Sequence, residues 1–170
     1  MSVIGGSSMN DWNRICCATD FEAASRVATE KAADLAARFG AELTLVHVRA
    51  APLVARTDAL IASRGMAAEE TRQDEDTLAE WRASAERRVG RPVRARVLSG
   101  EPAAEIVRLA REERCDLLVV GTHGRTGVPR LVLGSVAERV ARRSPCPVLV
   151  VHERGVPEKE DIAEEVAQYR

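Results

Sequence analysis

Three glycines and a serine between residues 121 and 135 have the types and spacing of a phosphate-binding loop. Gly121, Gly124 and Gly134 precede Ser135, and an apolar run ends at Val120. Glycine lets a ligand approach the main chain because it has no Cβ, and the first N–H groups of a helix favour anions. We therefore predict that this segment holds phosphates at the carboxyl end of a buried parallel strand.

Ser135 and Glu138 also fit a structural role that needs no ligand. Ser-x-x-Glu is the pattern of a capping box, in which the serine caps a helix and the glutamate reaches back to it. Loop glycines are also common in ordinary turns. Both interpretations stay open, because a capping hydroxyl still leaves other N–H groups for a phosphate.

Two other nucleotide-binding loops are excluded by the residues present. A Walker loop needs lysine after its last glycine, and Lys31 and Lys159 are the only lysines in the chain. The dinucleotide pattern Gly-x-Gly-x-x-Gly does not occur here either. The loop therefore represents a different kind of phosphate site.

The glycine spacing Gly-x2-Gly-x9-Gly-Ser resembles the nucleotide-binding signature of the universal stress protein family, in its ATP-binding branch. The segments GTHGRTG, LVLGSVAERV and SPCPVLVV are similar to the C-terminal half of that family. The resemblance covers roughly Asn13 to Val151 and is strongest from Asp116 onward. One departure is Glu22, where the family often has serine after Thr-Asp-Phe, and it puts the affinity for phosphate in question.

The resemblance implies a Rossmann-like α/β fold of the adenine nucleotide alpha hydrolase-like type. Such a fold has a five-stranded open parallel sheet, of order 3-2-1-4-5, with helices on both faces. The winding reverses between its first and fourth strands, and ligands of open α/β sheets bind at that point. Thr19 and Asp20 should then face Gly121–Arg125 across one cleft.

The family assigns further roles to residues of this cleft. Asp20 would lie against the nucleoside and Val48 would border the base, although Asp20 also fits a helix N-cap. Arg125 can supply charge and a fork of hydrogen-bond donors. No catalytic residue and no metal ligand is predicted. The predicted nucleotide-binding residues are Thr19, Asp20, Val48, Val120, Gly121, Gly124, Arg125, Gly134, Ser135 and Val136.

Apolar runs alternate with helical patterns along the chain, which is typical of a parallel sheet covered on both faces. The remaining segments are predicted as a loop or lid over 52–65 and as two terminal extensions. Residues 1–12 are predicted as a disordered extension, 13–152 as the universal stress protein domain, and 153–170 as a charged tail that is either a short helix or partly disordered. The predicted strands are 14–18, 42–48, 93–98, 116–120 and 147–151, and the predicted helices are 23–39, 66–89, one from 102, and 135–143.

Composition limits the partners of this 170-residue chain. A net charge of -1 gives no electrostatic reason to bind nucleic acid or an anionic membrane, and no apolar run approaches the ~18 residues of a membrane span. The four cysteines have no zinc spacing and suit a reduced, cytoplasmic setting. His47 is expected in the core or at its rim, and His123 has no predicted catalytic role.

These observations predict a cytoplasmic ATP-binding stress-response protein that acts as a nucleotide-dependent sensor or regulator. Mg²⁺ would arrive with the triphosphate. One alternative is a slow ATPase or nucleotidyl-transfer enzyme that uses the same cleft. Another is a dimeric interaction protein that has lost nucleotide affinity. A homodimer through the apolar edge strand Pro147–Val151 is expected from the resemblance and from the exposed edge of the sheet.

Overall fold

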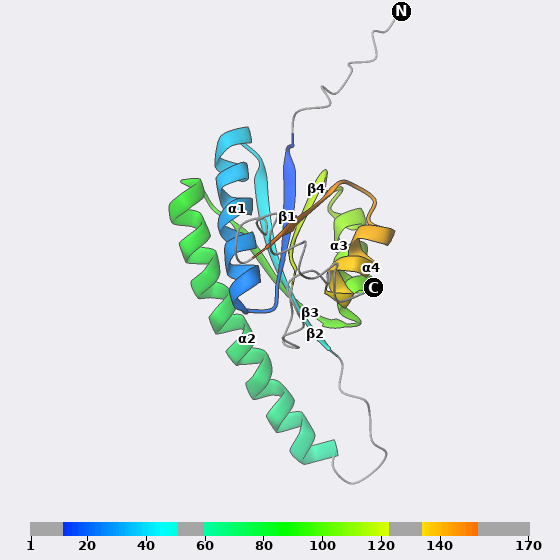
Figure 1. Ribbon diagram of the computed structural model, residues 1–170. Coiled ribbons are helices and arrows are strands. Elements are labelled where there is room, and N and C mark those ends of the chain that lie inside the picture. Colours follow the sequence, from blue (N-terminus) through cyan, green and yellow to red (C-terminus); the bar gives the residue numbers. More distant parts are fainter. Residues whose placement is uncertain (1–11, 51–59, 123–133, 153–170) are drawn as a thin grey trace, which may run out of the picture.

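The computed structural model of the chain describes residues 12–50, 60–122 and 134–152, with side chains from residue 69 onward in the second range. The described strands and helices alternate along the chain (Figure 1). In order, they are β1 (Arg14–Thr19), α1 (Ala23–Phe39), β2 (Glu42–Ala50), α2 (Leu60–Val89), β3 (Arg94–Gly100), α3 (Pro102–Glu112), β4 (Leu117–Gly121), α4 (Ser135–Arg143) and β5 (Val148–Val151).

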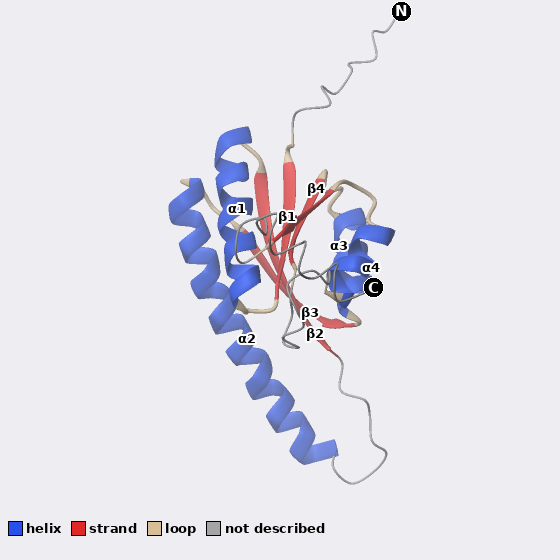
Figure 2. Cartoon of the chain, in the orientation of Figure 1, coloured by secondary structure: helices blue, strands red, loops and turns tan. Residues whose placement is uncertain are grey.

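The strands form one parallel sheet of order β3-β2-β1-β4-β5. Helices α1 and α2 cover one face, and α3 and α4 cover the other (Figure 2). The predicted fold class and strand order are confirmed. β1 is the central strand, so its two neighbours are β2 and β4, and the chain reverses its winding direction between β1 and β4.

Each face of the sheet has its own aliphatic core. Along β1, Ile15 and Cys17 face α1 and α2, whereas Cys16 faces α3 and α4. Alanines line the buried side of α1, including Ala28 and Ala32 at 0% exposed. Such small side chains let the helix lie close to the sheet, which fits the aliphatic composition of the chain.

Two of the predicted boundaries need correction. α2 begins at Leu60, so the loop predicted over 52–65 is wrong for its last residues, while 51–59 lie outside the described residues. The helix includes Gly65, because the strong helix formers around it outweigh the low helix propensity of one glycine. At the N-terminus, Trp12 was assigned to the extension, yet its ring packs edge-on against Phe39 with centroids 5.0 Å apart. Residues 1–11 and 153–170 are also outside the described part.

The C-terminal end of α1 matches its sequence signal, which is a glycine. Gly40 ends α1 in the left-handed conformation, at φ 67°, as expected for a residue without a Cβ. None of the described helices combines the length and the apolar character that crossing a membrane requires.

Candidate functional site

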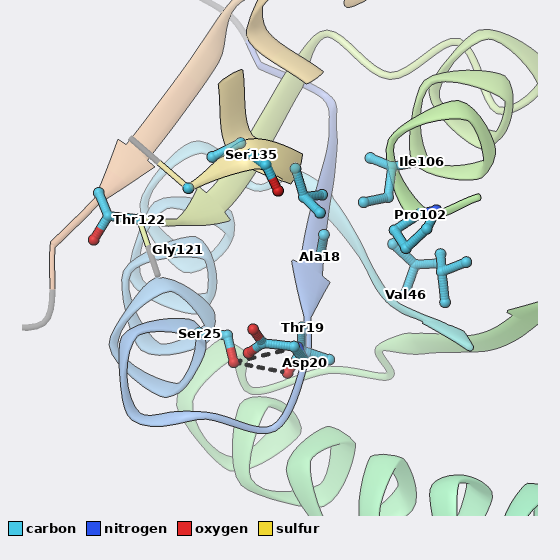
Figure 3. A pocket seen from close by; sticks show the side chains of 14 residues that line it. Ala18, Thr19, Asp20, Ser25, Val46, Pro102, Ile106, Gly121, Thr122 and Ser135 are labelled. Carbon is cyan, nitrogen blue, oxygen red and sulfur yellow. Dashed lines mark hydrogen bonds between the residues drawn. The ribbon is translucent and has the colours of Figure 1, made fainter. Parts of the chain in front are cut away.

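A cleft lies at the carboxyl ends of β1 and β4, where the strand order reverses (Figure 3). Two segments far apart in the sequence meet in it: the turn after β1 and the start of α4. Its cavity volume is about 170 Å³, below the roughly 300–1,000 Å³ of pockets that enclose a whole drug-sized ligand. A cavity of this size would enclose part of a drug-sized ligand and not the whole of it.

Most of the predicted site residues that the structure describes line this cleft. They are Thr19, Asp20, Val48, Gly121, Gly134, Ser135 and Val136. Val120 is not among the residues that line the cavity, and its side chain is 4% exposed in the core under α3 and α4. Its role in nucleotide binding stays a prediction. Gly124, Arg125 and His123 lie outside the described residues.

Sequence reasoning missed a further set of lining residues. Pro102 and Ile106 come from α3, a helix to which no role in the site was assigned. Only Pro102 had an indication in the sequence, because it follows a short loop at the same end of the sheet. The missed residues are Ala18, Ser25, Val46, Pro102, Ile106, Thr122 and Ala137.

The turn between β1 and α1 is held by hydrogen bonds from its own side chains. The hydroxyl groups of Thr19 and Ser25 lie 3.2 Å apart, and the N–H of Phe21 donates to Thr19 Oγ1 at 3.1 Å. The N–H of Glu22 donates to Asp20 Oδ1 at 3.1 Å. The helix N-cap is Glu22, not Asp20, so the N-cap alternative for Asp20 is wrong. The carboxylate of Asp20 instead closes the turn at the edge of the cleft.

Phe21 gives this turn its shape. Its φ is 66°, in the left-handed region that side chains other than glycine rarely adopt. The ring stacks on His47 with centroids 4.3 Å apart and meets Trp81 edge-on at 5.6 Å. His47 in turn donates from Nδ1 to the carbonyl of Thr19 at 2.8 Å. His47 is therefore a core residue that supports the turn, as expected from the sequence, and the aromatic contacts offset the backbone strain.

The start of α4 differs from the predicted capping box. The N-cap is Gly134, which makes no side-chain cap, and Ser135 is the first helical residue. Glu138 turns away from the N-terminus and pairs with Arg142 at 2.8 Å. The capping-box alternative is therefore wrong. Since no side chain of the N-cap fills this helix end, its N–H groups and partial positive charge favour an anion in the cleft.

Gly121 has a packing role that the sequence did not show. A Cβ at this position would lie 2.9 Å from two backbone atoms of α1, the carbonyl carbon of Ala24 and the nitrogen of Ser25. Real Cβ atoms do not approach backbone so closely, so only glycine lets the end of β4 touch the first turn of α1. This contact brings the two sides of the cleft together.

The lining combines apolar and polar surfaces suited to different parts of one ligand. Val46, Val48 and Ile106 give an apolar wall, while the hydroxyl groups of the lining come from threonine and serine. Within the described part of the lining, Asp20 is the sole carboxylate. The described residues contain no group of three or more His, Cys, Asp or Glu side chains placed to hold a metal ion. The site thus fits a ligand with an apolar ring at one end and an anion at the other.

Comparisons with known proteins identify the family and the fold. Residues 11–152 match the model of the universal stress protein family. A putative universal stress protein of Staphylococcus haemolyticus is 34% identical over 161 residues, which cover 94% of this chain and 94% of that protein. Two universal stress proteins of Methanocaldococcus jannaschii match shorter segments at 49% and 43% identity. These segments cover 42% and 37% of this chain and only 40% and 39% of those relatives.

Solved structures show the same fold. The universal stress protein UspA of Lactobacillus plantarum superposes with a TM-score of 0.75 at 23% identity, over 83% of this chain and 98% of that one. A universal stress protein in complex with cAMP gives 0.66 at 27% identity, over 85% and 99%. One from Archaeoglobus fulgidus, in complex with dAMP, gives 0.60 at 23% identity, over 82% and 98%.

Proposed function

The chain belongs to the universal stress protein family, and from this premise we propose that it binds ATP in the cleft between β1 and β4. In this proposal the protein is a cytoplasmic sensor or regulator that responds to the nucleotide during stress. The proposal rests on one observation: the glycine-capped start of α4 and the turn of Asp20 line the same cavity.

Each part of ATP has a matching part of the cleft. The adenine ring would lie against the apolar wall of Val46, Val48 and Ile106. The carboxylate of Asp20 would accept hydrogen bonds from ribose hydroxyl groups. The phosphates would lie at the start of α4, where N–H groups and the Ser135 hydroxyl donate to them. Gly124 and Arg125 keep their proposed roles in phosphate binding.

Relatives support a nucleotide more than they support ATP in particular. A universal stress protein at 27% identity forms a complex with cAMP. Such a ligand shares the adenine ring, the ribose and a phosphate with ATP, so the same three surfaces would bind either nucleotide. ATP is the proposed ligand of this chain because its glycine pattern resembles that of the ATP-binding branch of the family. Mg²⁺ would then be held mainly by phosphate oxygens.

Hydrolysis of ATP is proposed to be slow at most. Asp20 is the one carboxylate in the described lining, and its Oδ1 already accepts a hydrogen bond from the N–H of Glu22. A general base has to take a proton from the attacking water in a suitable position. Phosphate release measured alongside binding would separate a binding protein from an ATPase.

We also propose that β5 pairs two chains into a homodimer. β5 lies at one edge of the sheet, and Leu149 on it is 36% exposed. An apolar edge strand of this kind readily pairs with another chain. Light scattering of the wild type and of Leu149→Glu should give a dimer and a monomer, respectively. A monomeric wild type at micromolar concentration would contradict the dimer.

Nucleotide binding is best tested with two valine variants that add the same bulk on opposite faces of the sheet. Val48 is half-buried in the cleft lining, whereas Val97 is half-buried on β3 against the core of α1 and α2. Val48→Trp should weaken ATP binding by at least 10-fold in isothermal titration. Val97→Trp should change it by no more than about 3-fold. Ten-fold corresponds to about 1.4 kcal/mol.

Equal ATP affinities in the two variants would contradict the proposed site, and no heat of binding in the wild type would contradict the proposed ligand. Mass spectrometry of small molecules released from the denatured, freshly purified protein gives an independent check. It should identify an adenine nucleotide. Release of a different nucleotide would support the cleft as a nucleotide site and contradict ATP as its ligand.

A further inference from the structure

A second hollow lies away from the cleft, in the groove between α1 and α2, which run side by side on one face of the sheet (Figure 1). Its volume is about 530 Å³, within the roughly 300–1,000 Å³ of pockets that hold a small-molecule ligand. The described residues that line it all differ from those of the cleft. The proposed nucleotide site therefore leaves this groove without a role.

The floor of the groove is apolar. Ala33 of α1 and Ala85 of α2 are 0% and 3% exposed, and Trp81 of α2 is 6% exposed. Arg26 lies across this floor, with its guanidinium 4.6 Å from the centroid of the Trp81 ring. Long charged side chains cover apolar surface in this way while their heads stay in water. The surface that a ligand meets first is thus the charged layer above the floor.

Arg26 can contact a ligand in two ways at once. A guanidinium is planar and stacks on aromatic rings, as it does here on Trp81. Its outer plane is left for a second ring, and its edge carries donors for a carboxylate. Trp81 is in turn held edge-on by Phe21 at 5.6 Å, so the stack has a fixed base. Arg26 is exposed, which gives a ligand access to both its plane and its edge.

The ion pairs around the groove leave two arginines for an anion. Arg88 bridges the two helices, because its guanidinium lies 3.8 Å from Glu30 and 3.2 Å from Asp34. Arg26 and Arg87 line the same groove and form no ion pair with a carboxylate in the described part of the chain. Two guanidinium groups that are not neutralised within the described residues therefore border one hollow.

We propose that this groove binds a small aromatic carboxylate. The ring stacks on the outer plane of Arg26 and extends the Trp81–Arg26 stack by one layer, while the carboxylate pairs with Arg26 and Arg87. Glu80 lines the same groove, and its single negative charge reduces the attraction without cancelling it. This site is separate from the nucleotide cleft and does not depend on the proposed function.

The two tryptophans of the chain allow a direct test by NMR. Trp81 lines the groove, whereas Trp12 packs against Phe39 at the C-terminal end of α1. Each indole N–H gives one peak, and Trp12→Phe assigns them. Titration of 2-naphthoate into the full-length protein should shift the Trp81 peak until it saturates and leave the Trp12 peak in place. The neutral 2-naphthalenemethanol lacks the charge and should bind about 5-fold more weakly.

Arg87 and Arg82 form a matched pair for testing the charge. Both are exposed on α2, but Arg87 lines the groove, whereas Arg82 lies outside the described lining and 3.8 Å from Glu86. Arg87→Gln should weaken the binding of 2-naphthoate about 5-fold, and Arg82→Gln should change it by no more than about 2-fold. Glu80→Gln should strengthen it by about 2-fold, because a charge of the same sign as the ligand is removed.

Two bulky substitutions without an indole separate the groove from the cleft. Ser84 is exposed and lines the groove, so Ser84→Tyr should abolish the shift of the Trp81 peak, while Val48→Phe in the cleft should preserve it. The proposal is overturned if the Trp81 peak of the wild type does not move at millimolar 2-naphthoate, or if the alcohol binds equally well. Equal effects of Arg87→Gln and Arg82→Gln would also overturn it. The wild-type titrations decide this even where a variant fails to fold.

Discussion

Helices α3 and α4 lie side by side on the same face of the sheet, and both begin at the cleft. Their first turns are capped differently. At α3 the carboxylate of Glu101 accepts from the N–H groups of Ala103 and Ala104, at 3.3 and 2.8 Å, and Pro102 has no N–H to satisfy. At α4 the N-cap is Gly134, which has no side chain to offer. One helix end is capped by a carboxylate of the chain, and the N-cap of the other offers no side chain.

The two helix ends are also linked by an ion pair. Arg139 of α4 lies 2.8 Å from the carboxylate of Glu101, and its Nε donates to Ser135 O at 3.1 Å. The guanidinium offsets the negative charge that caps α3. A phosphate at the neighbouring end of α4 therefore meets less repulsion than the carboxylate alone would cause. Under the proposed function, the N-cap residue decides which of the two helix starts is available to a phosphate.

The largest expected effect comes from giving α4 the kind of cap that α3 has. Gly134 has φ -54° and ψ 143°, which any residue can adopt, so Gly134→Asp should fold and cap the helix. Its carboxylate would take the place of a phosphate, and we expect ATP affinity to fall about 100-fold, or about 2.7 kcal/mol, in isothermal titration.

Gly134→Asn separates charge from capping. Asparagine caps as well as aspartate but is neutral, so it should weaken ATP binding less than Gly134→Asp does. If both variants bind ATP as the wild type does, the start of α4 is no more a phosphate site than the start of α3.

Removing the cap of α3 should affect stability instead of binding. Glu101→Ala loses the hydrogen bonds to the first turn, and the free energy of unfolding should fall by about 1–2 kcal/mol in urea denaturation. The Kd for ATP should stay within about 3-fold of the wild type. A large loss of ATP affinity with unchanged stability would reverse the roles given to the two helix ends.

Ser135→Ala gives the converse result on α4. Because Ser135 is a helical residue and not the cap, the stability of the protein should hardly change. The loss of one hydroxyl donor should weaken ATP binding about 5-fold, or about 1 kcal/mol. Thermal unfolding without nucleotide is the control. If Ser135 were the cap, its replacement by alanine would lower the melting temperature.

The smallest expected effect concerns the ion pair between the two helices. Arg139→Ala removes a pair whose partners are each 43% exposed, and such exposed pairs contribute only about 0.2–1 kcal/mol. We expect ATP binding to weaken slightly, by about 2-fold, and more at low salt than at high salt. Titration at two ionic strengths measures this, and an effect independent of salt would argue against a charge-based role.

The sequence predicted the layout of the fold better than the details of the cleft. Strands such as β4 are continuous apolar runs, and helix α1 ends at a glycine, so both are local signals. The left-handed Phe21 has no such signal, because its conformation depends on His47 and Trp81, which are distant in the chain. Ser25 was missed for a different reason: its contacts with Thr19 and with the carbonyl of Glu22 are local, but a serine in a first helical turn has no pattern that predicts them.

The capping box failed for a different physical reason. Ser135 and Glu138 have the required spacing, but spacing does not fix which residue leaves the helical conformation. Gly134 takes that position, and Glu138 has a nearer partner in Arg142 on the same helix. Val120 shows a related limit for strands, because its place in an apolar run predicts a buried side chain but not whether that side chain lines the cleft.

The contact between Gly121 and the first turn of α1 sets the width of the cleft through the main chain. Side chains can rotate to admit a bulkier molecule, but two backbones in contact cannot move apart without shifting a strand or a helix. Selection by size should therefore survive most changes of the lining residues, and a broader choice of ligands would require a change in how α1 is seated on the sheet.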